Sequence, residues 1–83
     1  LEVELIIYPP FSKSVPESIW GEEQKIEQNS DGSINFKAIM SGKSSVKKWI
    51  LGMGSSVKVI KPEGMRDEII DEGRRMLELY NRW

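Results

Sequence analysis

The chain has 83 residues with no cysteine and no histidine, and its 12 basic and 13 acidic side chains give a net charge of −1. A chain of this length is expected to form one domain with a thin core, because it buries only about 60% of the surface that it exposes when unfolded. The near-zero net charge argues against a domain that grips duplex DNA by itself, since such domains carry a basic surface. Wholly apolar runs are far shorter than the roughly 20 residues needed to span a bilayer. We therefore expect a cytoplasmic protein that does not enter a membrane.

Enzymatic chemistry has little support in this composition. Without histidine and cysteine, the usual pairs of nucleophile and base and most transition-metal sites are excluded. The carboxylate pairs Asp67-Glu68 and Asp71-Glu72 alternate with the apolar residues of a predicted helix, so they are expected to face solvent. The segment 52–56 is rich in glycine and serine, but it follows a helix and precedes a strand, the reverse of a phosphate-binding loop. We predict a protein that is not an enzyme and has no catalytic residue, no metal site and no cofactor.

Periodicity and turn signals divide the first half of the chain into a strand, a short helix and a hairpin. Residues 2–8 alternate with a period of two, which is typical of a half-buried strand, and two prolines end the run. Ser14, with a proline two residues later, can cap a short helix that ends near Gly21. Residues 22–29 and 34–40 are expected to pair as a β-hairpin, because the Asp-Gly step between them tolerates the positive φ of a tight turn.

The second half predicts a helix, a strand and a longer final helix. Ser44 or Ser45 can cap a helix whose apolar residues recur at three- and four-residue spacing until Gly52 stops it. Residues 56–61 alternate again as a strand, which Pro62 ends while opening the last helix. That helix has one apolar stripe and is expected to dock on the body along its whole length through Met65, Ile69, Gly73, Met76, Tyr80 and Trp83.

This element order predicts an α+β, ferredoxin-like βαββαβ sandwich with an additional C-terminal helix. The helices of such a fold cover one sheet face, here expected to hold Val3, Leu5, Ile7, Ile26, Ile34, Phe36, Ala38, Met40, Val57 and Val59. The other face is expected to be mostly polar, with Glu4, Lys25, Glu27, Asn35, Lys37 and Lys58. Ile6, Ile39 and Ile60 reach that face from three strands, which predicts a patch for self-association or interdomain contact. Burial of these isoleucines under the last helix is the open alternative.

Trp49 lies beside the apolar stripe of the middle helix. A tryptophan in that place is most often a core residue, but tryptophan is also enriched in interfaces. We expect core packing first and partner contact second.

A family resemblance is carried by Lys48–Gly54, Val57–Pro62, Met65–Ile69 and Tyr80. In this order and spacing the residues resemble the C-terminal extension (WCX) domain that follows the WYL domain in bacterial transcriptional regulators. Val3–Leu5, Glu17 before Trp20, and Asp31–Ser33 agree as well, so the resemblance covers almost the whole chain. Met65 departs from the leucine that is usual there, and Lys61 stands before the proline, so the resemblance does not identify a ligand.

The resemblance implies that residues 1–83 are a single domain excised from a larger regulator with an N-terminal winged helix and a WYL effector domain. It implies a module that helps to build a homodimer, contacts the WYL domain of the same or the partner chain and leaves duplex DNA to the N-terminal domain. We expect Arg66, with Lys58 and Lys61, to contact an anionic effector such as nucleic acid, because a guanidinium near the amide-rich start of a helix suits an anionic group. An ion pair between Arg66 and Glu63 or nearby acids is the open alternative.

Two other functions fit the same topology to different degrees. Ferredoxin-like domains also serve as sensors of small molecules such as amino acids, an alternative that rests on the fold alone. An acylphosphatase-like enzyme would need an arginine in a glycine-rich loop after the first strand, and residues 8–14 contain neither arginine nor glycine.

Overall fold

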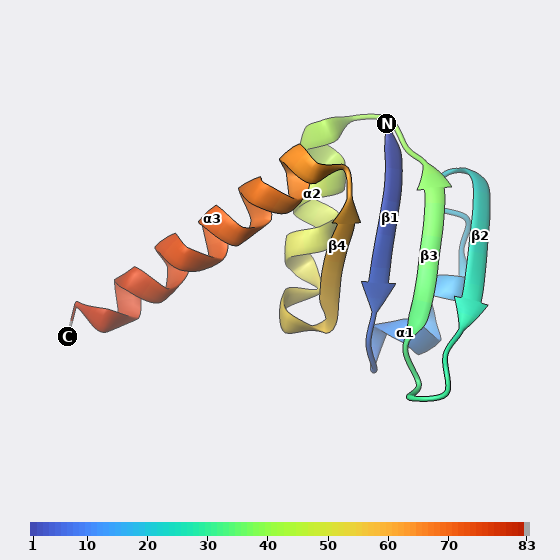
Figure 1. The fold of residues 1–83 in the computed structure, drawn as a ribbon, viewed down its shortest axis with the longest axis horizontal. Coiled ribbons are helices and arrows are strands. Elements are labelled where there is room, and N and C mark those ends of the chain that lie inside the picture. The colour runs from blue at the N-terminus through green and yellow to red at the C-terminus, as the bar shows by residue number, and fades with distance from the viewer. Residues whose placement is uncertain (83) are drawn as a thin grey trace.

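The computed structural model of the chain describes residues 1–82. Within that range the chain forms one mixed domain of strands and helices, with β-α-β-β-α-β order and a further helix at the end (Figure 1). The elements are β1 (Glu2–Ile7), α1 (Phe11–Ser14), η1 (Val15–Glu17), β2 (Glu22–Gln28), β3 (Ile34–Ile39), α2 (Lys43–Gly52), η2 (Gly54–Ser56), β4 (Val57–Lys61) and α3 (Glu63–Asn81).

The strands form one sheet in the order β2-β3-β1-β4, and every neighbouring pair is antiparallel. This is the arrangement of a split βαβ, ferredoxin-like fold, so the predicted fold class is confirmed. The predicted hairpin between β2 and β3 is also confirmed. Gly32 takes a φ of 87° in its turn, and the Asp31 carboxylate accepts a hydrogen bond of 2.9 Å from the Ser33 backbone N–H.

One face of the sheet forms the core, as the alternation predicted. Its buried residues are Val3, Leu5, Ile7, Ile34, Phe36, Ala38, Met40 and Val59, with Ile26 and Val57 partly buried against them. The helical segments between the strands cover this face. The cluster is completed by Val15 of η1, Val46 and Ile50 of α2, Met53, and Met65 of α3. The opposite face of the sheet carries none of the buried core residues in the described range.

The short helix after β1 begins and ends earlier than the sequence predicted. Helical structure starts at Phe11 and ends at Glu17, and Ser18 is already extended, with φ −131° and ψ 158°. Ser14 is the N-cap of η1, as predicted, but its side chain makes no capping hydrogen bond. The predicted end near Gly21 was wrong. In α2 the N-cap is Gly42, with φ 81°, and no serine side chain caps the helix.

The prediction that the last helix docks along its whole length was wrong. Met65 is buried and Ile69 is partly buried against the core, but Met76 is 51% exposed and Tyr80 is 76% exposed. Figure 1 shows α3 leaving the sheet near the end of β4 and running away from the body. Its apolar stripe is longer than the core it can reach. Trp83, the last residue of the predicted stripe, lies outside the described residues.

Candidate functional site: the open face of the sheet

The four strands of the described residues form a single sheet. A row of charged residues, one from each strand, crosses its open face. Pairing places Lys25 of β2 opposite Lys37 of β3 and Lys37 opposite Glu4 of β1. Glu4 in turn lies opposite Lys61 of β4. The three lysines are exposed and Glu4 is half-buried. We call Lys25, Lys37, Glu4 and Lys61 the lysine row, which presents three ammonium groups around one carboxylate.

A bulge in β4 brings Lys61 into this row. Lys58 and Lys61 are three positions apart, so an unbroken strand would turn them to opposite faces of the sheet. The register between β1 and β4 instead shifts at Glu4 and Leu5, which puts Lys58 opposite Ile6 and Lys61 opposite Glu4. Ile6 and Glu4 are two positions apart and share a face. The two lysines that the sequence singled out therefore lie together on the open face.

The charges of the row are incompletely paired. Lys61 Nζ lies 3.8 Å from Glu4 Oε2, an exposed contact of the kind that contributes little to stability. Within residues 1–82, no carboxylate lies at ion-pairing distance from Lys25 or Lys37. Like charges directly opposite one another in a sheet are destabilising. An anion bound between Lys25 and Lys37 would remove this repulsion, so the row is chemically suited to phosphate or carboxylate groups.

Arg66 is held by acids of its own helix. Its guanidinium lies 3.6 Å from Glu63 and 3.8 Å from Asp67, and its side chain is 44% exposed. Its backbone N–H donates a 3.0 Å hydrogen bond to the Pro62 carbonyl, which fixes it in the first turn of α3. The structure thus contains the ion pair between Arg66 and Glu63, which was the open alternative in the sequence. Part of the guanidinium remains accessible beside the end of β4.

Two of the three isoleucines of the predicted patch, Ile6 and Ile39, lie apart on the open face. Ile39 pairs at one end of β1 and Ile6 near the other, and the charged pair of Glu4 and Lys37 lies between them. Ile60 falls at the bulge of β4, outside the regular register. Ile39 is 42% exposed, so the last helix does not cover it. The register therefore separates Ile39 from Ile6 by a charged pair.

Trp49 takes part in an aromatic stack at the margin of the core. Its ring is half-buried, packs at 5.6 Å from the Phe36 ring and stacks at 4.9 Å on Trp20, measured between centroids. Trp20 in turn borders a surface hollow of about 500 Å³ with Ile19, Ile39 and Met40 among its lining residues. The expected core packing of Trp49 is confirmed, but this hollow was not predicted. An apolar Ile19-Trp20 step in a loop before Gly21 was the available signal.

A comparison with known protein families shows to which family the domain belongs. The model of the WCX domain family matches residues 1–77, from β1 through most of α3. This chain belongs to the WCX domain family. The match confirms the resemblance to a WCX domain, and it supports a regulatory type of domain. No curated protein matches the chain.

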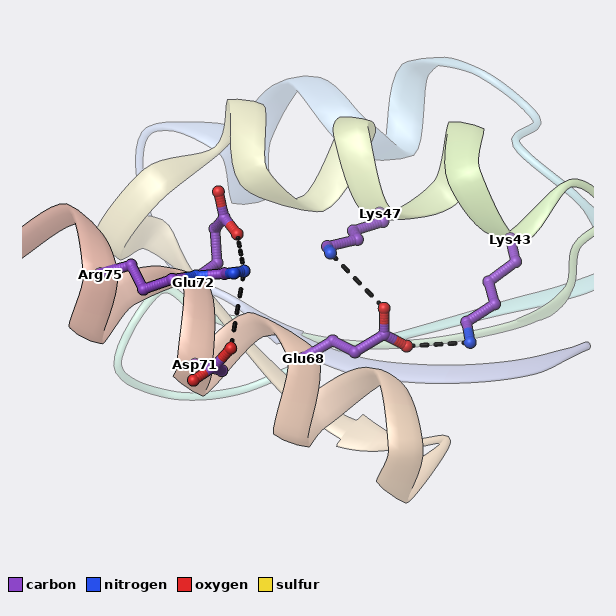
Figure 2. Close-up of polar contacts among 6 residues, drawn as sticks. All are labelled: Lys43, Lys47, Glu68, Asp71, Glu72 and Arg75. Carbon is purple, nitrogen blue, oxygen red and sulfur yellow. Dashed lines mark hydrogen bonds and ion pairs between the residues drawn. The ribbon is translucent and has the colours of Figure 1, made fainter.

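Glu68, near the start of α3, forms ion pairs with two lysines of α2 (Figure 2). Lys43 Nζ lies 2.9 Å from one oxygen of Glu68 and Lys47 Nζ lies 3.4 Å from the other. The hydrogen bond from Lys43 is the main reason that the pKa of Glu68 lies below its ordinary value. The pKa of Asp31 is also lowered, chiefly by its hydrogen bond from the Ser33 hydroxyl. The two ion pairs of Glu68 link α2 to the start of α3.

Within residues 1–82, no three acidic side chains gather in a way that could hold a metal ion. None of the helices in this range is long and apolar enough to cross a membrane.

Proposed function

We propose that this WCX domain is the regulatory and self-association module of a WYL-domain transcriptional regulator, and that its open sheet face contacts an anionic effector. The family match over residues 1–77 is the observation that carries the proposal. The lysine row and Lys58 support the anionic part, because they place four lysines on one exposed face. The module acts by binding rather than by chemistry.

The lysine row suits a polyanion better than a single small anion. It runs across strands that lie about 4.8 Å apart, so its ammonium groups are spread along a line perpendicular to the strands. Lysine contacts phosphate as a point charge without demanding one orientation. A chain of phosphates, as in single-stranded nucleic acid, can therefore lie along the row. Arg66 extends this surface when the effector competes with Glu63 and Asp67 for its guanidinium.

In this proposal the domain works within a homodimeric regulator. It contacts the WYL domain of the same or the partner chain, while a separate N-terminal domain reads duplex DNA. The net charge of −1 suits a module that leaves duplex binding to another domain. Signals reach the DNA-binding part through the arrangement of the two copies.

A second candidate function is the sensing of a small molecule, and the hollow beside Trp20 favours it. Its volume of about 500 Å³ lies within the range of small-molecule sites. Ile19, Trp20 and Met40 give it an apolar lining, and Glu22 adds a carboxylate at its border. A free amino acid with an apolar side chain, whose ammonium group can meet Glu22, fits this chemistry.

Calorimetric titration of the chain with two probes separates the functions. The anionic-effector proposal predicts salt-dependent binding of a single-stranded oligonucleotide and no binding of free amino acids. The small-molecule proposal predicts the opposite result, with binding that is lost in Trp20→Ala. Absence of oligonucleotide binding at low salt would contradict the proposed role of the open face.

A further inference from the structure

Strand β2 has a free edge. It is the first strand in the order β2-β3-β1-β4, and within residues 1–82 no strand pairs with its outer side. Figure 1 shows β2 at the margin of the sheet, with no helix or strand beyond it. An open edge presents unpaired N–H and C=O groups, which form a template for a strand of another chain. The edge of β2 is therefore a candidate interaction surface.

The hydrogen bonds of the hairpin show which backbone groups of β2 point outward. The Asn29 N–H donates a 2.9 Å hydrogen bond to the Ser33 carbonyl, so the backbone of Asn29 faces β3. Backbone directions alternate along an antiparallel strand, so the residues two and four positions earlier face β3 as well. The backbone N–H and C=O groups of Ile26 and Gln28 therefore point away from the sheet.

The charges of β2 are complementary to a second copy of the same strand. An antiparallel pair about a two-fold axis at Ile26 sets Lys25 of each copy opposite Glu27 of the other, because these two residues flank Ile26. Both side chains are exposed, and within residues 1–82 neither has an ion-pair partner. Opposite charges directly across two strands stabilise the pair. The same axis brings the outward-facing backbone of Ile26 opposite its own copy, as ladder hydrogen bonds require.

The neighbouring registers are disfavoured by charge. A ladder forms only where outward-facing residues meet, so the next registers have their axis at Lys25 or at Glu27. An axis at Lys25 sets Lys25 beside its own copy, and an axis at Glu27 does the same for Glu27. Like charges directly opposite one another are destabilising. The charge pattern of the edge therefore favours the register centred on Ile26 over the registers on either side of it.

We infer that β2 is the self-association element of this domain and pairs antiparallel with β2 of a second copy, which joins the two sheets into one. The inference rests on the self-association proposed above and assigns it to one strand. Residues directly opposite one another share a face, so the open faces of both copies lie on the same side of the joined sheet. An anion on the lysine row and Glu27 of the second copy are then rival partners of Lys25.

Sedimentation equilibrium of charge-reversal variants at low salt tests the assignment. Lys25→Glu sets two carboxylates opposite each other and Glu27→Lys sets two ammonium groups so, and each should raise the dimer dissociation constant about tenfold or more. The double variant Lys25→Glu/Glu27→Lys restores opposite charges and should restore the dissociation constant. An equimolar mixture of the two single variants should form a heterodimer for the same reason. Lys48→Glu, at an exposed residue of α2, is the control and should change nothing.

Amide hydrogen exchange locates the contact without any substitution. The outward-facing N–H groups of Ile26 and Gln28 should exchange rapidly in the dilute chain and become protected at concentrations where the dimer forms. The N–H groups of Lys25 and Glu27 face β3 and should be protected at both concentrations. Equal exchange of the Ile26 and Gln28 amides in monomer and dimer would show that β2 is not the contact.

The outcomes separate this inference from the proposed function. If the chain dimerises but neither single charge reversal changes its dissociation constant, self-association stands and β2 is not its element. If the double variant associates as weakly as the single variants, the register centred on Ile26 is wrong. If the unmodified chain stays monomeric at every concentration, both the pairing of β2 and self-association by the isolated domain are wrong.

Discussion

Trp20 stacks on Trp49 with the ring planes 28° apart and the centroids separated by 4.9 Å. The Trp20 indole N–H donates a 2.8 Å hydrogen bond to the Val15 carbonyl, which ties the loop before β2 to η1. Trp49 also contacts Phe36, a fully buried core residue. The aromatic stack therefore joins α2, the loop before β2 and the sheet at the edge of the core.

Replacing Trp49 should weaken this junction strongly. Trp49→Ala is expected to lower the free energy of unfolding by about 3 kcal/mol, because it leaves a cavity beside Phe36 and removes the partner of Trp20. Urea denaturation followed by circular dichroism measures the change. Lys48→Ala, at the exposed neighbouring position, should change the free energy by less than about 0.5 kcal/mol. Equal values for the two variants would show that Trp49 is not a core residue.

Gly21 is predicted to be intolerant of any side chain. A Cβ at this position would lie 2.6 Å from the Ile39 carbonyl oxygen and 2.8 Å from the Met40 side chain. Gly21→Ala should therefore destabilise the domain by about 1 to 3 kcal/mol in urea denaturation. Gly52→Ala is the matched control, because a Cβ there meets nothing within 4 Å. A Gly21→Ala variant as stable as the control would contradict the close packing of this loop on β3.

The ion pairs of Glu68 should make the domain sensitive to acid. Because the folded-state pKa of Glu68 lies below its ordinary value, its stabilising effect is present above the unfolded pKa and is lost as the pH falls through the folded pKa. The loss should occur below about pH 4.3, the ordinary value for a glutamate. Urea midpoints at several pH values should show a smaller acid effect in Glu68→Gln than in the unmodified chain. Glu78→Gln, which removes the same charge from α3, is the control.

Arg66 is predicted to matter for binding more than for folding. Its partners Glu63 and Asp67 are exposed and at least 3.6 Å away, so Arg66→Ala should change the free energy of unfolding by less than about 1 kcal/mol. If the guanidinium contacts the effector, the same substitution should lower oligonucleotide affinity by about tenfold or more. Fluorescence anisotropy and urea denaturation of one variant measure both quantities. Unchanged affinity would remove Arg66 from the site.

The sequence predicted the sheet well because its strands alternate cleanly. Phe36 and its neighbours on β3 are buried at every second position, which a period of two already indicates. The prediction that α3 packs on the domain along its whole length was wrong. Periodicity shows that a helix has an apolar side, but it does not show whether that side contacts the rest of the domain. Met76 and Tyr80 follow the same spacing as the buried Met65, yet they lie beyond the edge of the sheet.

The candidate site was predictable only in part for a similar reason. Alternation placed Lys25 and Lys37 on the open face, but which residues of different strands are neighbours depends on the register. The bulge that turns Lys61 to the same face as Lys58 has no signal in the strand residues themselves. The acids that hold Arg66 were visible in the sequence because they lie on the same helix turn.

The salt dependence of oligonucleotide binding tests the role of the lysine row most directly. The double substitution Lys25→Gln/Lys37→Gln should weaken binding of a single-stranded oligonucleotide and should reduce the slope of log affinity against log salt by about 1.4, since each lost phosphate contact contributes about 0.7. Lys13→Gln/Lys48→Gln removes the same charge from exposed positions outside the row. The account predicts that this control keeps the affinity and the slope of the unmodified chain. Equal effects of the two double substitutions would contradict it, because binding would then depend on net charge and not on the open face of the sheet.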